Sequence, residues 1–193
     1  MARTYDAIDG RLADFVLGQS VFFVATAPSG DGGHVNCSPK GNDGTLALLG
    51  PRTLAYLDGT GSGVETIAHL RDNGRIVLMW CAFAGPPRVV RVHGQGEAVV
   101  DGDPRFVALC DRFAGGVPLG TRAVVVVEAE RISDACGYGV PLMDFVAHRD
   151  AMDTWARQKG PDGLAEYQSQ RNATSLDGLP GLPDRPDRVR GAS

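Results

Sequence analysis

A lysine, a serine hydroxyl and a proline lie together in the stretch Asn36-Cys37-Ser38-Pro39-Lys40-Gly41. Pro39 has no backbone N–H, so a central β-strand cannot continue normally through it. A strand that breaks here can direct the Ser38 hydroxyl and the Lys40 ammonium toward an anion such as phosphate. A polar strand exit with a solvated lysine is the alternative interpretation of the same residues.

A glycine-rich stretch, Thr60-Gly61-Ser62-Gly63-Val64-Glu65-Thr66, follows a predicted strand and opens a predicted helix. The free N–H groups at the start of a helix suit a phosphate. The same residues also fit a capping box, in which Ser62 and Glu65 satisfy those N–H groups internally. Glu65 would repel a phosphate unless its side chain turned away.

A third polar pattern runs along residues 85–96 and begins with Gly-Pro-Pro-Arg88. Alternation along a strand places Arg91, His93, Gln95 and Glu97 on one face. Gly94 and Gly96 predict a bulge or a closely approached backbone. A solvated polar face is the alternative explanation of the charged set.

Metal binding and thiol chemistry are not indicated. The four histidines do not cluster at metal-ligand spacing, and the four cysteines form no zinc-ligand pattern. Cys37 has no histidine or aspartate pattern beside it, so we expect reduced, non-catalytic thiols. Trp80 and Trp155 are interpreted as packing residues.

The pattern of elements predicts a mainly β protein with helices, an antiparallel barrel or sandwich. An amphipathic helix is expected over residues 8–16, ending near Gly18. Further helices are expected from Ser62 to Gly74, from Asp103-Pro104, and over residues 149–159 and 163–171. Strands are expected over residues 21–26, 34–40, 45–49, 53–57, 75–83, 88–100 and 121–132.

The chain divides into a barrel domain with its N-terminal helix (1–135), a glycine-rich loop with helices packed on the same domain (136–176), and a loop or disordered tail (177–193). Its 193 residues suit one domain. The net charge of −4 without a basic stripe argues against nucleic acid as a partner. No signal peptide or membrane-length apolar run is present, so we expect a soluble, cytoplasmic protein.

Taken together and in order, several motifs resemble the pyridoxamine 5'-phosphate oxidase-like FMN-binding proteins. They are FFVATA (22–27), VNCSPKG (35–41), TGSG (60–63), ETIAHL (65–70) and GPPR (85–88). The later stretches CGYGVPLM (136–143) and NATSLDGLPGL (172–182) resemble a bacterial branch of that family. The resemblance covers about residues 19–183.

The resemblance implies a six-stranded antiparallel split β-barrel with a C-terminal helical extension, forming a homodimer with FMN between the subunits. It implies cofactor contacts from Asn36, Cys37, Ser38, Pro39, Lys40, Ser62, Gly63, Thr66, Arg88 and Tyr138. Arg88 would reach the cofactor from the partner subunit, and Tyr138 would cover the ring. The expected activity is that of an FMN-dependent oxidoreductase with a small-molecule substrate, in which no side chain need act as acid or base.

The chain departs from the vitamin B6 enzyme of this family, because only Lys40 stands where several arginines are expected. Two alternatives therefore stay open. The first is a deazaflavin- or haem-binding split barrel, for which Arg71, Arg75 and Arg91 are the available cations. The second is a non-catalytic flavin-binding module, favoured by the lack of a legible catalytic side chain.

Overall fold

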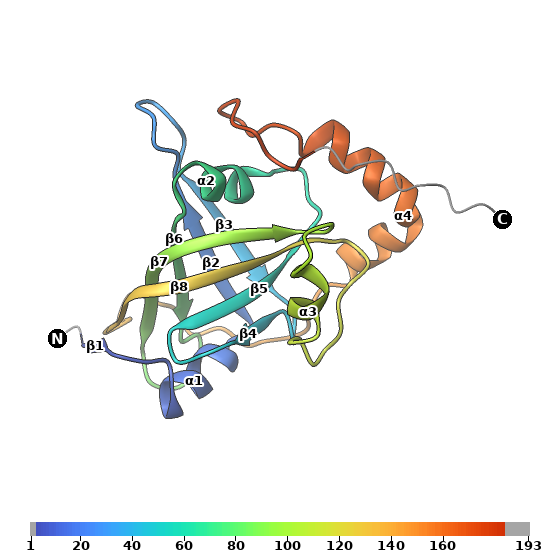
Figure 1. Ribbon diagram of the computed structural model, residues 1–193. Coiled ribbons are helices and arrows are strands. Elements are labelled where there is room, and N and C mark those ends of the chain that lie inside the picture. The colour runs from blue at the N-terminus through green and yellow to red at the C-terminus, as the bar shows by residue number, and fades with distance from the viewer. Residues whose placement is uncertain (1–2, 184–193) are drawn as a thin grey trace.

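One antiparallel sheet, strongly curled, forms the body of the protein (Figure 1). The structure is a computed structural model that describes residues 3–183. In these residues the sheet has eight strands, in the order β3-β2-β6-β7-β8-β5-β4, with β1 paired to β8. Their bounds are β1 Thr4–Tyr5, β2 Val21–Thr26, β3 Asn36–Gly41, β4 Leu46–Leu48, β5 Thr53–Gly59, β6 Arg75–Cys81, β7 Val89–Val100 and β8 Thr121–Ala135.

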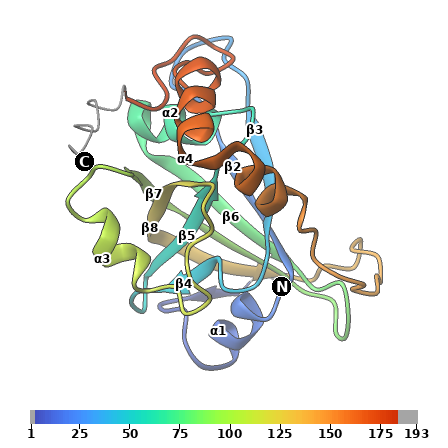
Figure 2. The same cartoon turned by 90° about the vertical axis from the view of Figure 1, so that its right-hand side faces the viewer.

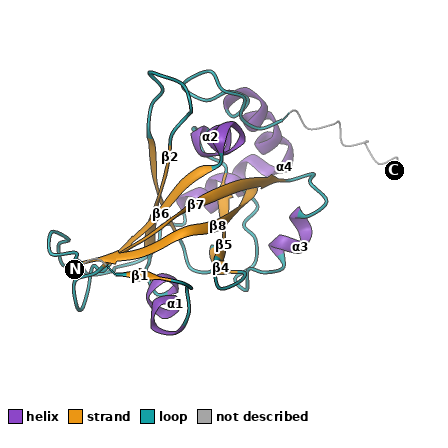
Figure 3. Cartoon of the chain, turned by 60° about the vertical axis from the view of Figure 1, so that its left-hand side comes forward, coloured by secondary structure: helices purple, strands orange, loops and turns teal. Residues whose placement is uncertain are grey.

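Helices lie at both ends of the curled sheet and on its outside (Figures 1 and 3). Helix α1 (Gly10–Leu17) lies at one end, and α2 (Glu65–Asn73) lies at the other. The short α3 (Phe106–Cys110) lies outside β5 and β8. Helix α4 (Ala151–Arg171) lies at the same end as α2 and is broken at Gly160, whose backbone is not helical (Figure 2).

The hydrophobic core fills the inside of the curled sheet. Strand β2 illustrates how the sequence places apolar side chains inside the sheet. Its residues alternate between buried and half-buried, and Phe22 and Val24 point inward. Phe22 packs against the rings of Tyr56 and Trp80, whose centroids lie 5.6 and 5.7 Å away. Buried side chains of the α1 region, Ile8, Leu12 and Val16, close one end of this core.

The two edges of the sheet are β3 and β4, and they are not hydrogen-bonded to each other as strands in the described residues. Residues 42–45 link them directly. The Thr45 hydroxyl donates to the Gly41 carbonyl oxygen, and the Leu57 N–H donates to the Thr45 carbonyl oxygen. The barrel is therefore split between β3 and the β4–β5 pair. Beyond this connection, no backbone hydrogen bond among the described residues joins β3 to β4 or β5, so side-chain contacts must hold the two edges together.

A bulge between β7 and β8 lies at Gly94, as the glycine pattern predicts. The pairing register shifts between His93 and Gly94. A Cβ atom added at Gly94 would overlap the carbonyl oxygen of Glu128 on β8. Glycine is required here because the neighbouring backbone approaches too closely for any side chain.

The predicted fold class is confirmed, and several boundaries need correction. The resemblance implied six strands, whereas the described residues contain eight, because β1 and β4 are short additions of two and three residues. Helix α2 begins at Glu65 with Val64 at its N-cap, so the predicted start at Ser62 is wrong. Helix α3 begins at Phe106, since the Asp103 carboxylate accepts the Arg105 N–H and forms a turn before the helix.

The C-terminal helices are present on either side of the break at Gly160, close to their predicted bounds. Residues 172–183 then return as a loop along α2. The Leu182 N–H donates to the Asn172 carbonyl oxygen, and Arg71 donates to the carbonyl oxygen of Gly181. The first part of the predicted tail is thus a loop held by hydrogen bonds, and residues 184–193 lie outside the described part.

Replacing Gly94 tests whether the bulge holds β7 and β8 in register. Gly94→Ala should lower the free energy of unfolding by about 1–3 kcal/mol, because the methyl group forces the two strands apart. Gly139→Ala is the matched control, since nothing lies within 4 Å of a Cβ added there. Urea unfolding followed by circular dichroism measures both, and equal stability of the two variants would contradict this account.

Candidate functional site

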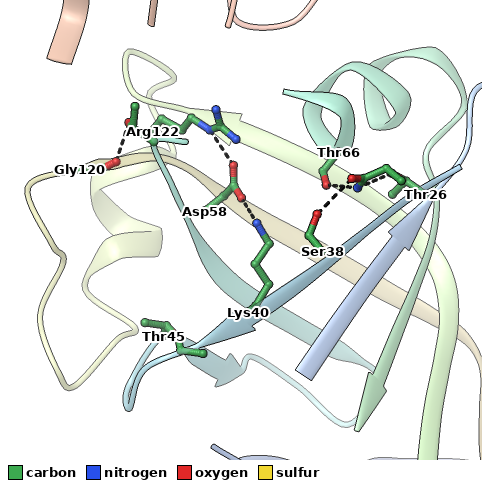
Figure 4. A network of polar contacts seen from close by, with 11 residues as sticks. Thr26, Ser38, Lys40, Thr45, Asp58, Thr66, Gly120 and Arg122 are labelled. Carbon is green, nitrogen blue, oxygen red and sulfur yellow. Dashed lines mark hydrogen bonds and ion pairs between the residues drawn. The ribbon is translucent and has the colours of Figure 1, made fainter. Parts of the chain in front are cut away.

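A buried carboxylate joins the two sides of the split barrel (Figure 4). Asp58 on β5 is fully buried, and its two oxygens accept from different cations. Lys40 Nζ on β3 lies 2.6 Å from Asp58 Oδ1, and Arg122 Nε on β8 lies 2.8 Å from Oδ2. The Lys40 and Arg122 side chains are 19% and 5% exposed. We call these three residues the Asp58 triad.

The Asp58 triad carries one negative and two positive charges. Burial alone would raise the pKa of Asp58, but the charges and hydrogen bonds of Lys40 and Arg122 outweigh it and lower that pKa. Asp58 therefore stays ionised, and the triad keeps a net charge of +1. The fully buried Tyr56 lies beneath it, and burial, with the charge of Asp58, raises the pKa of its phenol.

A cluster of hydroxyl and amide groups lies beside the triad, between β3, β2 and α2 (Figure 4). Asn36 Nδ2 donates to the hydroxyl oxygens of Thr66 and Thr26, at 3.0 and 3.4 Å. The Ser38 hydroxyl donates to Asn36 Oδ1 at 3.1 Å. The Thr26 hydroxyl also contacts Nδ1 of the buried His69 at 3.0 Å. The structure thus brings together three of the predicted cofactor contacts: Asn36, Ser38 and Thr66.

A cavity of about 440 Å³ opens next to Lys40, at the end of β3. Pro39, Lys40 and Arg149 line it, together with backbone of Gly41, Gly59 and Gly120. This volume lies within the range of small-molecule sites, roughly 300–1,000 Å³. Lys40 and Arg149 place two cationic groups in the cavity wall, and Asp153 places one acidic group there. An anion with an organic body can be accommodated here.

Cys37 lies on the opposite side of β3 from this cluster. Side chains alternate along a strand, so Asn36, Ser38 and Lys40 share the inner face, and Cys37 and Pro39 share the outer one. Cys37 is exposed, and all four cysteines of the described residues are free thiols. A contact from the Cys37 side chain to the cluster is excluded within one subunit, which leaves only its backbone.

The start of α2 is occupied by the chain itself. The Glu65 carboxylate lies against Gly63, where it would overlap an added Cβ, and accepts the Leu176 N–H at 3.2 Å. The predicted capping box is wrong, because no side chain caps the helix. The expectation that Ser62 and Gly63 present an open helix start to phosphate is not met, since a carboxylate stands there.

Arg88 and Tyr138 lie together, but away from the hydroxyl cluster. Arg88 Nη2 donates to the Tyr5 hydroxyl at 2.9 Å and to Asp134 at 3.2 Å. Its backbone packs against Gly137, and Tyr138 is 82% exposed in the same loop. Across the paired strands Ser38 is level with Val92, and Arg88 lies four residues before Val92, about 13 Å along the strand direction.

Sequence reasoning missed Asp58, Arg122 and Gln168. Asp58 directly follows the apolar run Leu54–Leu57, and Arg122 directly precedes the apolar run Ala123–Val127. One charged residue at the end of each of two buried strands is a signal for a buried ion pair, because such charges are rarely buried unpaired. Gln168 gave no signal, because its environment depends on how α4 folds back.

Residues 3–183 contain no group of three or more His, Cys, Asp or Glu side chains that is placed to hold a metal ion. No helix in this part of the chain has the length and apolar character needed to cross a membrane.

The curled antiparallel sheet, its open edges and the polar site between them define a split-barrel protein. The family model described as pyridoxamine 5'-phosphate oxidase matches residues 8–136, about two thirds of the chain. The chain belongs to the pyridoxamine 5'-phosphate oxidase family. It is 40% identical to the family protein ustO of Aspergillus flavus over 190 residues, which cover 91% of this chain and 76% of that protein.

A solved structure with a TM-score above 0.5 shows the same fold. A variant of HupZ from Group A Streptococcus superposes with a TM-score of 0.53 at 23% identity, covering 66% of this chain and 99% of HupZ. An FMN-binding protein from Syntrophomonas wolfei matches with a TM-score of 0.45 at 16% identity, covering 62% of this chain and 80% of that one.

Removing the central carboxylate should destabilise the barrel. Asp58→Asn leaves Lys40 and Arg122 facing each other without a counter-charge, and we expect a loss of about 3–5 kcal/mol in the free energy of unfolding. Because the pKa of Asp58 is lowered in the folded protein, its contribution is complete above the unfolded value of 3.8. That contribution decreases as pH falls below 3.8 and is lost as pH falls through the pKa of Asp58 in the folded protein, which is lower.

Denaturant unfolding of wild type and Asp58→Asn at pH 7 and at pH 3 measures both effects. The stability difference should be large at pH 7 and shrink at pH 3. A difference that is the same at both pH values would mean that the Asp58 charge does not hold the split closed.

Proposed function

We propose that this chain is an FMN-binding oxidoreductase that acts as a homodimer on a small-molecule substrate. The observation that carries the proposal is the Asp58 triad, whose net positive charge borders a 440 Å³ cavity and a cluster of hydroxyl groups. Two cations share one carboxylate, so positive charge remains for an anionic ligand. Family membership points to the same class of chemistry.

The residues present fit the phosphate end of FMN. Lys40 and Arg149 would supply positive charge, and the hydroxyls of Ser38 and Thr66 would donate hydrogen bonds. Asp58 would hold the Lys40 ammonium in a fixed direction, which reduces the entropy lost on binding. When bound, FMN would supply the electron-transfer chemistry. The backbone of residues 36–38 would lie along the edge of the ring system.

The sequence of residues 60–66 suggests a phosphate-binding loop, but our proposal does not give this stretch that role. Since Glu65 stands at the start of α2, the phosphate contact passes from Ser62 and Gly63 to Ser38, Lys40 and Thr66. Ser62 and Gly63 stay candidates for contacts to the rest of the cofactor.

A homodimer accounts for the position of Arg88 and Tyr138. In the described subunit, Arg88 donates to Tyr5 and Asp134 instead of to the hydroxyl cluster, and Tyr138 is exposed. On the outer face of β2 and β6, the apolar side chains of Val21, Phe23, Ala25, Val77 and Met79 are only half-buried. We propose that this face packs on a second copy and brings Arg88 and Tyr138 to the partner's cofactor.

Two of the three cations considered for a longer deazaflavin tail, Arg71 and Arg75, are engaged elsewhere. Arg71 donates to the Gly181 carbonyl oxygen, and Arg75 donates to Asn73 and to the Pro28 carbonyl oxygen. An absorption spectrum of the purified protein separates flavin, deazaflavin and haem. Turnover with NADH or NADPH that scales with flavin occupancy would separate an enzyme from a flavin-storage module.

Neutralising Lys40 should weaken FMN binding. Lys40→Gln leaves Asp58 paired with Arg122, so the triad loses its excess positive charge. We expect the dissociation constant to rise about tenfold, equivalent to about 1.4 kcal/mol. Quenching of flavin fluorescence during titration of apoprotein measures it.

The chain's other lysine, Lys159, provides the matched control. Lys159→Gln removes the same charge from an exposed position on α4 and should leave FMN affinity unchanged. If both variants bind FMN as wild type does, Lys40 does not hold the phosphate, and the proposed site is wrong.

A charge on the outer face of β6 should break the proposed dimer. Val77→Glu should shift the protein to a monomer, because a carboxylate would be buried without a partner at the contact. Val107→Glu makes the same change on α3, where Val107 is 70% exposed, and should leave the assembly intact. Light scattering coupled to gel filtration distinguishes them, and a wild-type monomer would rule out this arrangement.

A further inference from the structure

A second and larger cavity lies between α4, residues 172–183 and the adjoining ends of β7 and β8. Its volume is about 610 Å³. Much of its wall is apolar and comes from Val100, Ala165, Ala173 and Leu182. Arg122 and Gln168 also line it, and both are 5% exposed. Buried polar side chains in the wall of an apolar cavity are a feature of ligand sites.

Arg122 is only partly satisfied by the Asp58 triad. Its Nε donates to Asp58, whereas its Nη1 is buried and has no hydrogen-bond partner among the described residues. An unpaired buried donor on a charged group carries a penalty larger than that of a neutral one. A guanidinium also matches the planar geometry of a carboxylate. Arg122 is therefore suited to bind the carboxylate of a ligand in this cavity.

Gln168 adds a complementary polar group. Its Nε2 donates to the Thr60 hydroxyl at 2.7 Å, which fixes the orientation of the amide. Its Oε1 is buried and lacks a partner in the described residues. That oxygen can only accept, so it selects a ligand with an N–H or O–H group.

Two carboxylates restrict the charge that the cavity can accept. Asp101 and Asp103 line it as well. Asp103 is paired with Arg105 at 2.9 Å and stays ionised, because hydrogen bonds from Arg105 lower its pKa to about 2. A doubly charged phosphate would be repelled by these groups, whereas a single carboxylate can stay at the Arg122 end.

We propose that this cavity binds a small monocarboxylate with an apolar body, with its carboxylate on Arg122 and a donor group on Gln168. The site is distinct from the proposed FMN site, because Asp58 stands between the two cations. Lys40 lines the cavity beside β3, and Arg122 lines the one beneath α4. One buried carboxylate thus orients a cation toward each cavity.

The probes that test this site are 2-hydroxyhexanoate, which has a carboxylate, an O–H donor and an apolar body, and its neutral amide, 2-hydroxyhexanamide. Isothermal titration of the full chain should show the hydroxy acid binding at least about tenfold more tightly than its amide. Arg122→Gln should remove this preference. Arg171→Gln removes an exposed cation from α4 and should leave the preference unchanged. Equal affinity for acid and amide in the wild type would overturn the proposal.

A variant outside the triad covers the case in which Arg122→Gln fails to fold. Ala165→Phe places a ring in the cavity and should weaken 2-hydroxyhexanoate binding about tenfold or more, while FMN affinity stays within about twofold of wild type. Unchanged affinity for the hydroxy acid in this variant, or its displacement by FMN, would show that the acid binds elsewhere. If the chain binds 2-hydroxyhexanoate as proposed but binds no FMN, the proposal for this cavity holds and the flavin proposal is wrong.

Discussion

The ion pair between Lys40 and Asp58 connects the two sides of the barrel that the backbone leaves apart. Strand β3 is at one end of the sheet and β5 is next to the other, so no strand ladder joins them in the described residues. The 2.6 Å contact bridges this gap with side chains. Because Arg122 on β8 holds the second oxygen, the carboxylate cannot turn away from Lys40 without breaking another charged contact.

Closing a barrel with a buried ion pair costs free energy of desolvation. Desolvation of the charges opposes burial, and apolar residues of similar size often give equal or greater stability. Stability alone therefore does not explain why two cations and one carboxylate are buried here. A role in binding an anionic ligand, as we propose, does explain them. The hydroxyl cluster around Asn36 lies on the same inner face of β3 and is already hydrogen-bonded internally. The site is thus organised before any ligand arrives.

Much of the fold was predictable, because it depends on local patterns. The alternation in Val21–Thr26 identifies an inward and an outward face, and Gly94 marks the bulge in β7. The positive φ of Gly74 ends α2 as expected. Helix starts were less predictable. Ser62 and Glu65 have the spacing of a capping box, but Glu65 bonds instead to Leu176, more than a hundred residues away.

The site was predicted only in part, because some of its contacts join residues that are far apart in the sequence. Asn36, Ser38 and Lys40 lie on one strand, so strand alternation alone puts them on one face. The partner of Lys40 comes from β5, and nothing local to residues 36–41 indicates it. The alternative interpretation of Lys40 as a solvated lysine at a strand exit is therefore wrong, because a buried carboxylate holds its ammonium group in place.

The same long-range effect determines what the C-terminal region does. Gln168 and Asn172 hydrogen-bond to the hydroxyl of Thr60 and the carbonyl oxygen of Gly61. The end of α4 therefore covers the glycine-rich stretch, and Glu65 occupies the start of α2 next to it. Because a carboxylate lies at the start of α2, our proposal assigns the attraction for an anion to the excess charge of the Asp58 triad. The position of α4 is thus the reason that the proposed site depends on two cations sharing one buried carboxylate and not on a helix start.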